Sequence, residues 1–124
     1  VLPEFEKLET IKTVVNITGN PVAGYNTWFE AYDDLKQKIA ECEFDVALLG
    51  CASYGLITAS YIKSLGKSAV HIGGGLQLLF GIRGHRWDSA QDWIDRGLYN
   101  EHWVRPSEEE TPGNAKNLEE AAYW

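Results

Sequence analysis

The sequence predicts a small α/β domain, in which a parallel sheet of about three strands is flanked by helices and followed by an irregular C-terminal third. Two observations predict this fold class. Short apolar or β-branched segments alternate with segments of helical periodicity, and the connections between them are short and rich in glycine. Strand–helix–strand order with right-handed crossovers places the helices on a parallel sheet, which is a Rossmann-like design. The length of 124 residues suits one such domain over residues 1–124.

The N-terminal part of the chain predicts one strand and one helix. Residues 12–17 (KTVVNI) are mostly apolar or β-branched and precede a Gly-Asn-Pro sequence at 19–21, which is typical of a strand followed by a turn. From Trp28 to Cys42 the apolar residues recur at three- and four-residue spacing. This spacing predicts an amphipathic helix, for which Asn26 or Thr27 can serve as the N-cap.

The middle of the chain predicts a strand–helix–strand unit. Phe44–Leu49 is an almost unbroken apolar run, too short for a helix, and predicts a strand buried on both faces of a parallel sheet. Residues 54–65 predict a helix, which Gly66 ends at the position where a left-handed residue is favoured. Ser68–Ile72 predicts a second short buried strand.

The pattern becomes looser after this unit. Residues 76–82 and 88–97 each predict a helix, whereas residues 100–117 contain two prolines and a run of glutamates and are expected to be irregular. The aromatic tail, residues 118–124, is expected to pack back on the domain.

Composition and charge exclude several classes of protein. A hydrophobic fraction of 44% is sufficient for a packed core, and a net charge of -7 argues against a nucleic-acid or anionic-membrane surface. We therefore expect neither a nucleic-acid nor a membrane partner. No apolar run approaches the roughly 20 residues of a membrane span and no signal-peptide pattern opens the chain, so we expect a cytoplasmic protein. Two cysteines are too few for a disulfide framework.

The chain begins at Val1 and contains no methionine. We expect it to be processed, trimmed or taken from the interior of a longer reading frame, in which case part of a functional site lies elsewhere.

The first candidate ligand loop follows the strand at Phe44–Leu49 and has the sequence GCASYG. Gly50 and Gly55 permit a tight turn and a close approach of the backbone, so the N–H groups of the loop can face an anion. Ser53 can add a hydroxyl donor or cap the following helix, and Tyr54 lies beside it. The loop matches neither a dinucleotide fingerprint nor a P-loop. A tight strand–helix joint without a ligand is an equally good interpretation.

The second candidate loop follows the strand at Ser68–Ile72. His71 is followed by Gly73, Gly74 and Gly75, with Gln77 close behind. Three glycines in a row are costly in conformational entropy, and open backbone beside a helix start suits a phosphate or a sugar hydroxyl. Because the carboxyl ends of parallel strands meet at one edge of a sheet, we expect the two glycine loops to lie side by side there. His71 alternates with apolar residues and fits a hydrogen-bonded structural histidine better than a catalytic base.

Two further segments carry polar and aromatic residues. Arg83 and Arg86 can donate forked hydrogen bonds to a phosphate, and Trp87 can stack on a base or sugar; alternatively, the arginines pair with carboxylates and the tryptophan is buried. Residues 99–106 are aromatic and polar for an irregular stretch and suit a cover over a ligand site, a packed surface loop or an oligomer contact. No catalytic residue, cofactor or metal cluster can be assigned. The predicted ligand-binding residues are Gly50, Ser53, Tyr54, Gly55, His71, Gly73, Gly74, Gly75, Gln77, Arg83 and Arg86.

The run from Phe44 to Asp88, together with residues 99–112 and the final Tyr-Trp, resembles the C-terminal part of a family of uncharacterised bacterial and phage proteins. The resemblance extends from about Trp28 to Trp124. More remotely, the order of strands and glycine loops is similar to glycosyltransferases of the GT-D fold. The resemblance implies that residues 50–55 and 73–77 flank a nucleotide-sugar pocket. The acidic metal-binding motif that such enzymes carry in their N-terminal half has no counterpart here.

Three hypotheses of function follow. The first is a domain of a glycosyltransferase-like protein that binds a nucleotide-sugar or another phosphate-bearing ligand, whether or not it is catalytic. The second is a non-enzymatic interaction domain that forms a homodimer through its aromatic C-terminal third. The third, a nicotinamide-dependent oxidoreductase, is disfavoured because the fingerprint lacks its third glycine and no acidic residue ends the Ser68–Ile72 strand.

Overall fold

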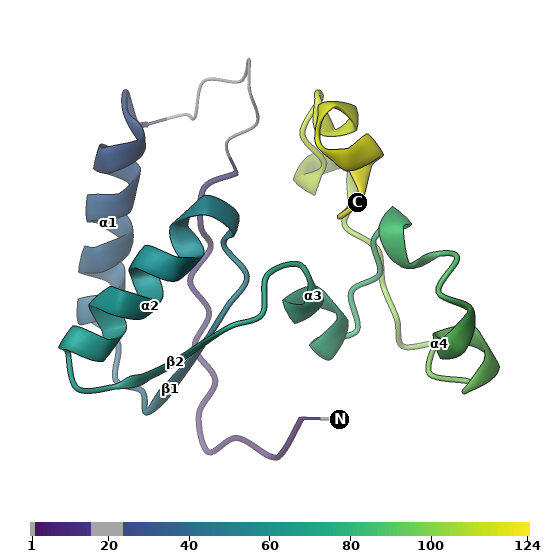
Figure 1. Ribbon diagram of the computed structural model, residues 1–124, viewed down its shortest axis with the longest axis horizontal. Helices are drawn as coiled ribbons and strands as arrows, with labels where there is room; N and C mark the ends of the chain where they lie inside the picture. Colours follow the sequence, from purple (N-terminus) through teal and green to yellow (C-terminus); the bar gives the residue numbers. More distant parts are fainter. Residues whose placement is uncertain (1, 16–23) are drawn as a thin grey trace. The chain divides into compact units, whose positions relative to one another are not determined.

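The computed structural model describes residues 2–15 and 24–124 and shows a mixed α/β protein with a small parallel sheet and flanking helices (Figure 1). By its internal contacts the described chain divides into two compact units. Unit 1 comprises residues 2–15 and 24–76, and unit 2 comprises residues 77–124. The organisation of all 124 residues as one domain stays a prediction.

The first helix, α1, runs from Trp28 to Ala40 and forms where the apolar spacing predicts it. Its N-cap is Thr27, whose hydroxyl accepts a hydrogen bond from the backbone N–H of Glu30 at 3.1 Å. Buried side chains at four-residue intervals, Ala31, Leu35 and Ile39, form the face that packs into the core.

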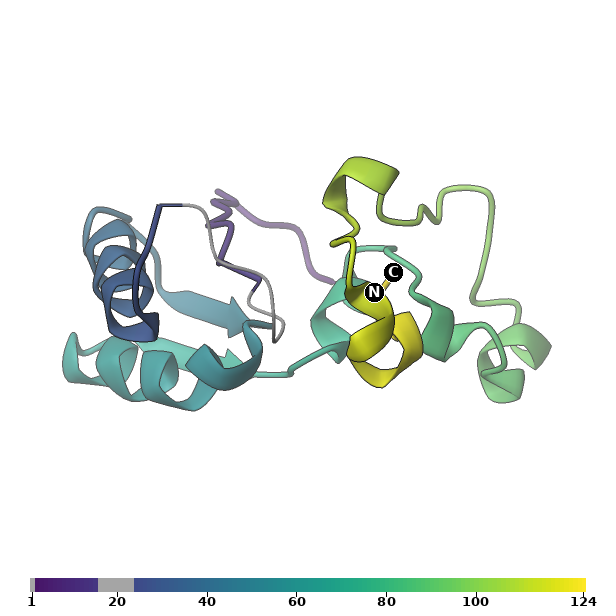
Figure 2. The same ribbon diagram turned by 90° about the horizontal axis from the view of Figure 1, so that it is seen from above.

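Two strands form the sheet. β1 (Val46–Leu49) and β2 (Ser68–His71) are parallel, and the helix α2 (Gly55–Ser64), preceded by a single 3₁₀ turn at Ala52–Tyr54, connects them. Gly66 follows α2 with a φ of +77°, which confirms the predicted left-handed end of that helix. In both views α1 and α2 lie side by side next to the strands (Figures 1 and 2).

The third strand expected over residues 12–17 is not formed within the described residues. Residues 12–15 have no strand assignment, and residues 16 and 17 lie outside the described part of the chain. The prediction is wrong for residues 12–15 because their β-branched composition favours extended backbone, whereas a strand also needs a hydrogen-bonded neighbour. Ile11 and Val14 nevertheless pack against the core of unit 1.

One face of the sheet contributes to that core. Ala47, Leu49 and Ala69 share a face, since side chains alternate along each strand, and all three belong to the cluster formed with the helices. On the opposite face Val46 and Val70 are 55% and 49% exposed. The prediction that β1 is buried on both faces is therefore wrong, because within the described residues this unit has helices on one face only.

Unit 2 consists mainly of turns and very short helices. The division between the units falls within α3 (Gly75–Leu79), and α4 spans Gln91–Asp95; both are shorter than the helices predicted over 76–82 and 88–97. Gly81 and Gly97, with φ values of +71° and +61°, follow these helices and limit their length. The irregular character expected of residues 100–117 is confirmed.

The C-terminal tail packs back within unit 2, as predicted. The backbone N–H groups of His85 and Arg86 each donate a 2.9 Å hydrogen bond, to the carbonyl oxygens of Trp124 and Ala122 respectively. A Cβ on Gly84 would lie 2.7 Å from the Ala122 carbonyl oxygen. The tail therefore lies closer to this turn than a residue with a Cβ at position 84 would allow.

Candidate functional site

The two predicted ligand loops lie side by side at the carboxyl ends of β1 and β2. The register pairs the last residues of the strands, Leu49 with His71, so both loops begin at the same level. The carbonyl oxygen of Leu49 accepts hydrogen bonds from the backbone N–H groups of Ile72 and Gly73, at 2.9 and 3.2 Å. The structure thus brings the residues from 50 to 55 together with those from 71 to 75 in unit 1.

Two of the loop glycines are required for close packing within the chain. A Cβ on Gly50 would lie 2.9 Å from Cβ of Leu76 and 3.0 Å from the carbonyl oxygen of Gly73. A Cβ on Gly55 would lie 2.2 Å from the nearest atom of the His71 ring. The space beside these glycines is therefore filled by Leu76 and His71, which supports the interpretation of a tight joint at these two positions.

His71 has the surroundings of a structural histidine. Its ring Nδ1 lies 3.2 Å from the carbonyl oxygen of Leu49, and the ring occupies the space that the missing side chain of Gly55 leaves at the start of α2. The imidazole thereby links the two loops.

The second loop leaves its backbone more open. Gly73 has a φ of +64°, and a Cβ there would meet no atom within 4 Å. Gly74 follows it, and Gly75 begins α3, where the nearest neighbour of an added Cβ is a methyl carbon of Ile72 at 3.1 Å. In the first loop Ala52 also has a left-handed φ, of 43°. Left-handed backbone is unfavourable for alanine, so this loop stores strain at the sheet edge where ligands bind in α/β proteins.

Tyr54 turns towards the body of unit 1, whereas Ser53 is exposed. The Tyr54 ring stacks on Trp28 with centroids 4.6 Å apart and planes 2° from parallel, and the residue is 3% exposed. The Ser53 hydroxyl accepts a hydrogen bond from the indole N–H of Trp28 at 3.3 Å. Burial raises the pKa of Tyr54, whose hydroxyl has no hydrogen-bond partner among the described residues. Tyr54 therefore serves the core rather than a ligand in this structure.

The remaining predicted residues, Gln77, Arg83 and Arg86, belong to unit 2. The amide nitrogen of Gln77 lies 3.4 Å from the Tyr123 carbonyl oxygen. Arg86 forms an ion pair with Glu119 and donates a 3.2 Å hydrogen bond to the Tyr123 hydroxyl. Both side chains thus hold the C-terminal tail.

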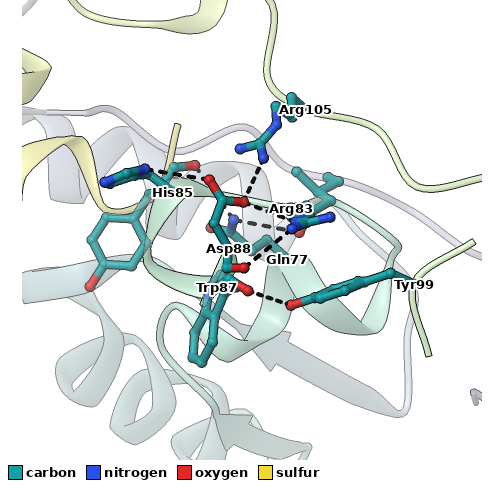
Figure 3. A network of polar contacts seen from close by, with 9 residues as sticks. Gln77, Arg83, His85, Trp87, Asp88, Tyr99 and Arg105 are labelled. Carbon is teal, nitrogen blue, oxygen red and sulfur yellow. Dashed lines mark hydrogen bonds and ion pairs between the residues drawn. The ribbon is translucent and has the colours of Figure 1, made fainter. Parts of the chain in front are cut away.

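Arg83 is part of a polar network centred on Asp88 (Figure 3). Its Nε donates a 2.9 Å hydrogen bond to Oδ1 of Asp88, and an Nη of Arg105 donates to the same oxygen at 2.5 Å. His85 Nδ1 lies 3.4 Å from the other carboxylate oxygen. The hydrogen bond from Arg105, reinforced by the charges of both arginines, lowers the pKa of Asp88, so this carboxylate stays ionised.

No protein-family model, curated protein or solved structure matches this chain. Within residues 2–15 and 24–124, no three His, Cys, Asp or Glu side chains are grouped so that they could hold a metal ion. No helix in that part of the chain has both the length and the apolar character needed to cross a membrane.

Sequence reasoning missed Arg105 and Asp88. A parallel bridge between Ile82 and Val104 brings Arg105 beside Arg83, and no local sequence pattern predicts that bridge. The alternative interpretation of Arg83 and Arg86, pairing with carboxylates, does describe what both side chains do. The alternative for Trp87 is burial: the residue is only partly buried, and its buried indole nitrogen has no partner among the described residues.

Proposed function

We propose that unit 1 binds a nucleotide-sugar or another small phosphate-bearing molecule at the loops after β1 and β2, as part of a glycosyltransferase-like protein. One observation carries the proposal: the Leu49–His71 register sets two glycine loops side by side at the carboxyl edge of a parallel sheet. Ligands of open α/β sheets bind at that edge. The left-handed backbone at Ala52 adds support, since strain concentrates at binding loops.

The backbone after β2 would supply most of the contacts. The segment Gly73–Gly75 has unobstructed backbone at Gly73, whereas the space at Gly50 and Gly55 is filled. The backbone N–H groups of Gly74 and Gly75 would donate to phosphate oxygens, and the Ser53 hydroxyl would donate from the neighbouring loop. The proposal includes a Rossmann-like sheet of more strands than β1 and β2.

A cytoplasmic location forms part of the same proposal. Cys42 and Cys51 are both free thiols. Burial raises the pKa of Cys51, so the thiol is protonated and unreactive, as suits a structural residue of a reducing compartment.

The test is a thermal-shift titration of the full chain with nucleotides and nucleotide-sugars, with and without a divalent cation. A ligand at about 100 times its dissociation constant should stabilise the protein by about 2.7 kcal/mol. Ser53→Ala should weaken that response, whereas Ser64→Ala should not, because Ser64 lies at the opposite end of α2 and its hydroxyl donates to the Tyr61 carbonyl of the same helix. A flat titration on folded protein, or equal responses of the two variants, would contradict the proposal.

A second candidate function, a homo-oligomeric interaction domain, is favoured by the uncovered face of the sheet. Parallel sheets are normally covered on both faces, yet Val46 and Val70 are about half exposed. Sedimentation velocity of the full chain would decide: a concentration-dependent dimer that Val70→Lys abolishes supports this function, and a strict monomer removes it. Deleting residues 118–124 would show whether the aromatic tail contributes to such a dimer.

A further inference from the structure

We propose that unit 2 contains an anion site, separate from the loops of unit 1, in which Arg83 and Arg105 together bind a phosphate group. The proposal does not depend on the function proposed above, because none of its residues belongs to unit 1.

The charges of the network are unequal. Two guanidinium groups share a single oxygen of Asp88, and in residues 2–15 and 24–124 neither arginine has another carboxylate partner. Arg83, Arg105 and Asp88 together therefore carry one net positive charge, although the whole chain has a net charge of -7. The neighbouring Arg86 differs, since Glu119 neutralises it. An excess of positive charge held at one place on an acidic protein attracts anions to that place.

The two guanidinium groups are held in position before any ligand arrives. The Arg83 guanidinium lies over the Tyr99 ring, 4.2 Å from its centroid, and the Tyr99 hydroxyl donates a 2.8 Å hydrogen bond to the Trp87 carbonyl. The bridge between Ile82 and Val104 fixes the backbone on the other side: the N–H of Arg83 donates to the Val104 carbonyl at 2.8 Å. In Figure 3 the contacts of both arginines meet at the Asp88 carboxylate. Groups that are already ordered lose little entropy on binding.

The contacts with Asp88 leave most donors of the two guanidinium groups unused within residues 2–15 and 24–124. Each guanidinium has five N–H groups in a planar fork, and the contacts with Asp88 use only a few of them. The side chain of Arg105 is 48% exposed, so a small solute can reach it. Two guanidinium groups that are close enough to share one carboxylate oxygen are also close enough to share the oxygens of one phosphate. The planar donors of a guanidinium group match the geometry of phosphate as well as that of carboxylate. Asp88 then acts as the positioning residue that keeps the two cations together.

The experiment is a titration of the full chain with inorganic phosphate at constant ionic strength, followed by the NMR signals of the arginine Nε–H groups. Saturable shifts are expected at Arg83 and Arg105 and not at Arg96, an exposed arginine after α4. Arg105→Gln should weaken phosphate binding by about ten-fold or more, whereas the matched charge change Arg96→Gln should alter it less than about two-fold. Arg105→Lys keeps the charge but removes the fork and should give an intermediate loss.

Three outcomes would overturn the proposal: the absence of saturable shifts at the two arginines, equal effects of Arg105→Gln and Arg96→Gln, or equally tight binding of acetate, which would identify a carboxylate site instead. If Arg105→Gln does not fold, the wild-type shifts and the Arg105→Lys variant still decide. Ser53→Ala, in the loop of unit 1, should leave these shifts unchanged, so the result is independent of the nucleotide-sugar titration.

Discussion

Replacing Gly50 by alanine tests the joint that holds the two loops of unit 1 together. The new Cβ would lie 2.9 Å from two atoms of Leu76 and 3.0 Å from the Gly73 carbonyl oxygen, where ordinary contacts begin at 3.4 Å. One of these neighbours is backbone and another is a Cβ, so neither can rotate away. Overpacking of this kind costs about 1–3 kcal/mol.

Part of that loss is offset in the unfolded chain. Alanine reduces the entropy of the unfolded state and stabilises a protein by about 0.4–1 kcal/mol where the native backbone allows it. The expected net loss for Gly50→Ala therefore lies between about 0 and 2.6 kcal/mol, which corresponds to a fall in Tm of up to roughly 10 °C at this chain length.

The measurement is urea unfolding followed by circular dichroism, with Gly113→Ala as the matched control. An added Cβ at Gly113 meets no atom within 4 Å, so that variant should be as stable as the wild type or slightly more stable. If Gly50→Ala is no less stable than Gly113→Ala, the two loops are not packed together and the reasoning about the site is refuted.

Three more outcomes follow from the structure. Ala52→Gly should raise the free energy of unfolding by about 0.5–1 kcal/mol in urea titrations, because it relieves left-handed strain at φ 43°; a loss would show that the strain is absent. Tyr54→Phe should leave stability unchanged or raise it by up to about 1 kcal/mol, because the hydroxyl is buried without a partner in the described chain; a clear loss would reveal a hidden partner. Asp88→Asn should reduce the acid sensitivity of unfolding: the folded pKa of Asp88 is lowered, so its contribution is present above about pH 4 and is lost as the pH falls through that lowered value. An unchanged pH profile for this variant would contradict the network.

The helices and strands of unit 1 could be predicted because their signals are local. The apolar spacing after Thr27 and the apolar run ending at Leu49 each predict an element from its own residues. The observed bounds of the helices and strands of unit 1 differ from the predicted ones by at most two residues. The strand over residues 12–17 has an equally local signal, but a strand also needs a neighbour, which composition does not specify. The exposure of Val70 could not be predicted either, because it depends on which elements cover that face of the sheet, and composition does not specify them.

The candidate site was predictable in its position and not in its details. Parallel strands bring their carboxyl ends to one edge, so the proximity of the two loops follows from chain order alone. Glycine is required at position 55 because the ring of His71 fills the space of a side chain there, and this contact exists only once the strands are paired. The arginine network could not be predicted from the sequence, since Arg83 and Arg105 become neighbours only through the pairing of Ile82 with Val104.

That pairing has a consequence for how ligand affinity in unit 2 should be interpreted. The bridge closes a long loop with few hydrogen bonds, among them those from Arg83 to Val104 and from Val104 to Gly81. Molecules in which the loop is open have separated arginines and do not offer the paired site. The dissociation constant observed for an anion equals the intrinsic constant divided by the fraction of closed molecules. A substitution at Val104 that merely favours the open loop would therefore weaken anion binding with both arginines intact, and the anion would in turn favour loop closure.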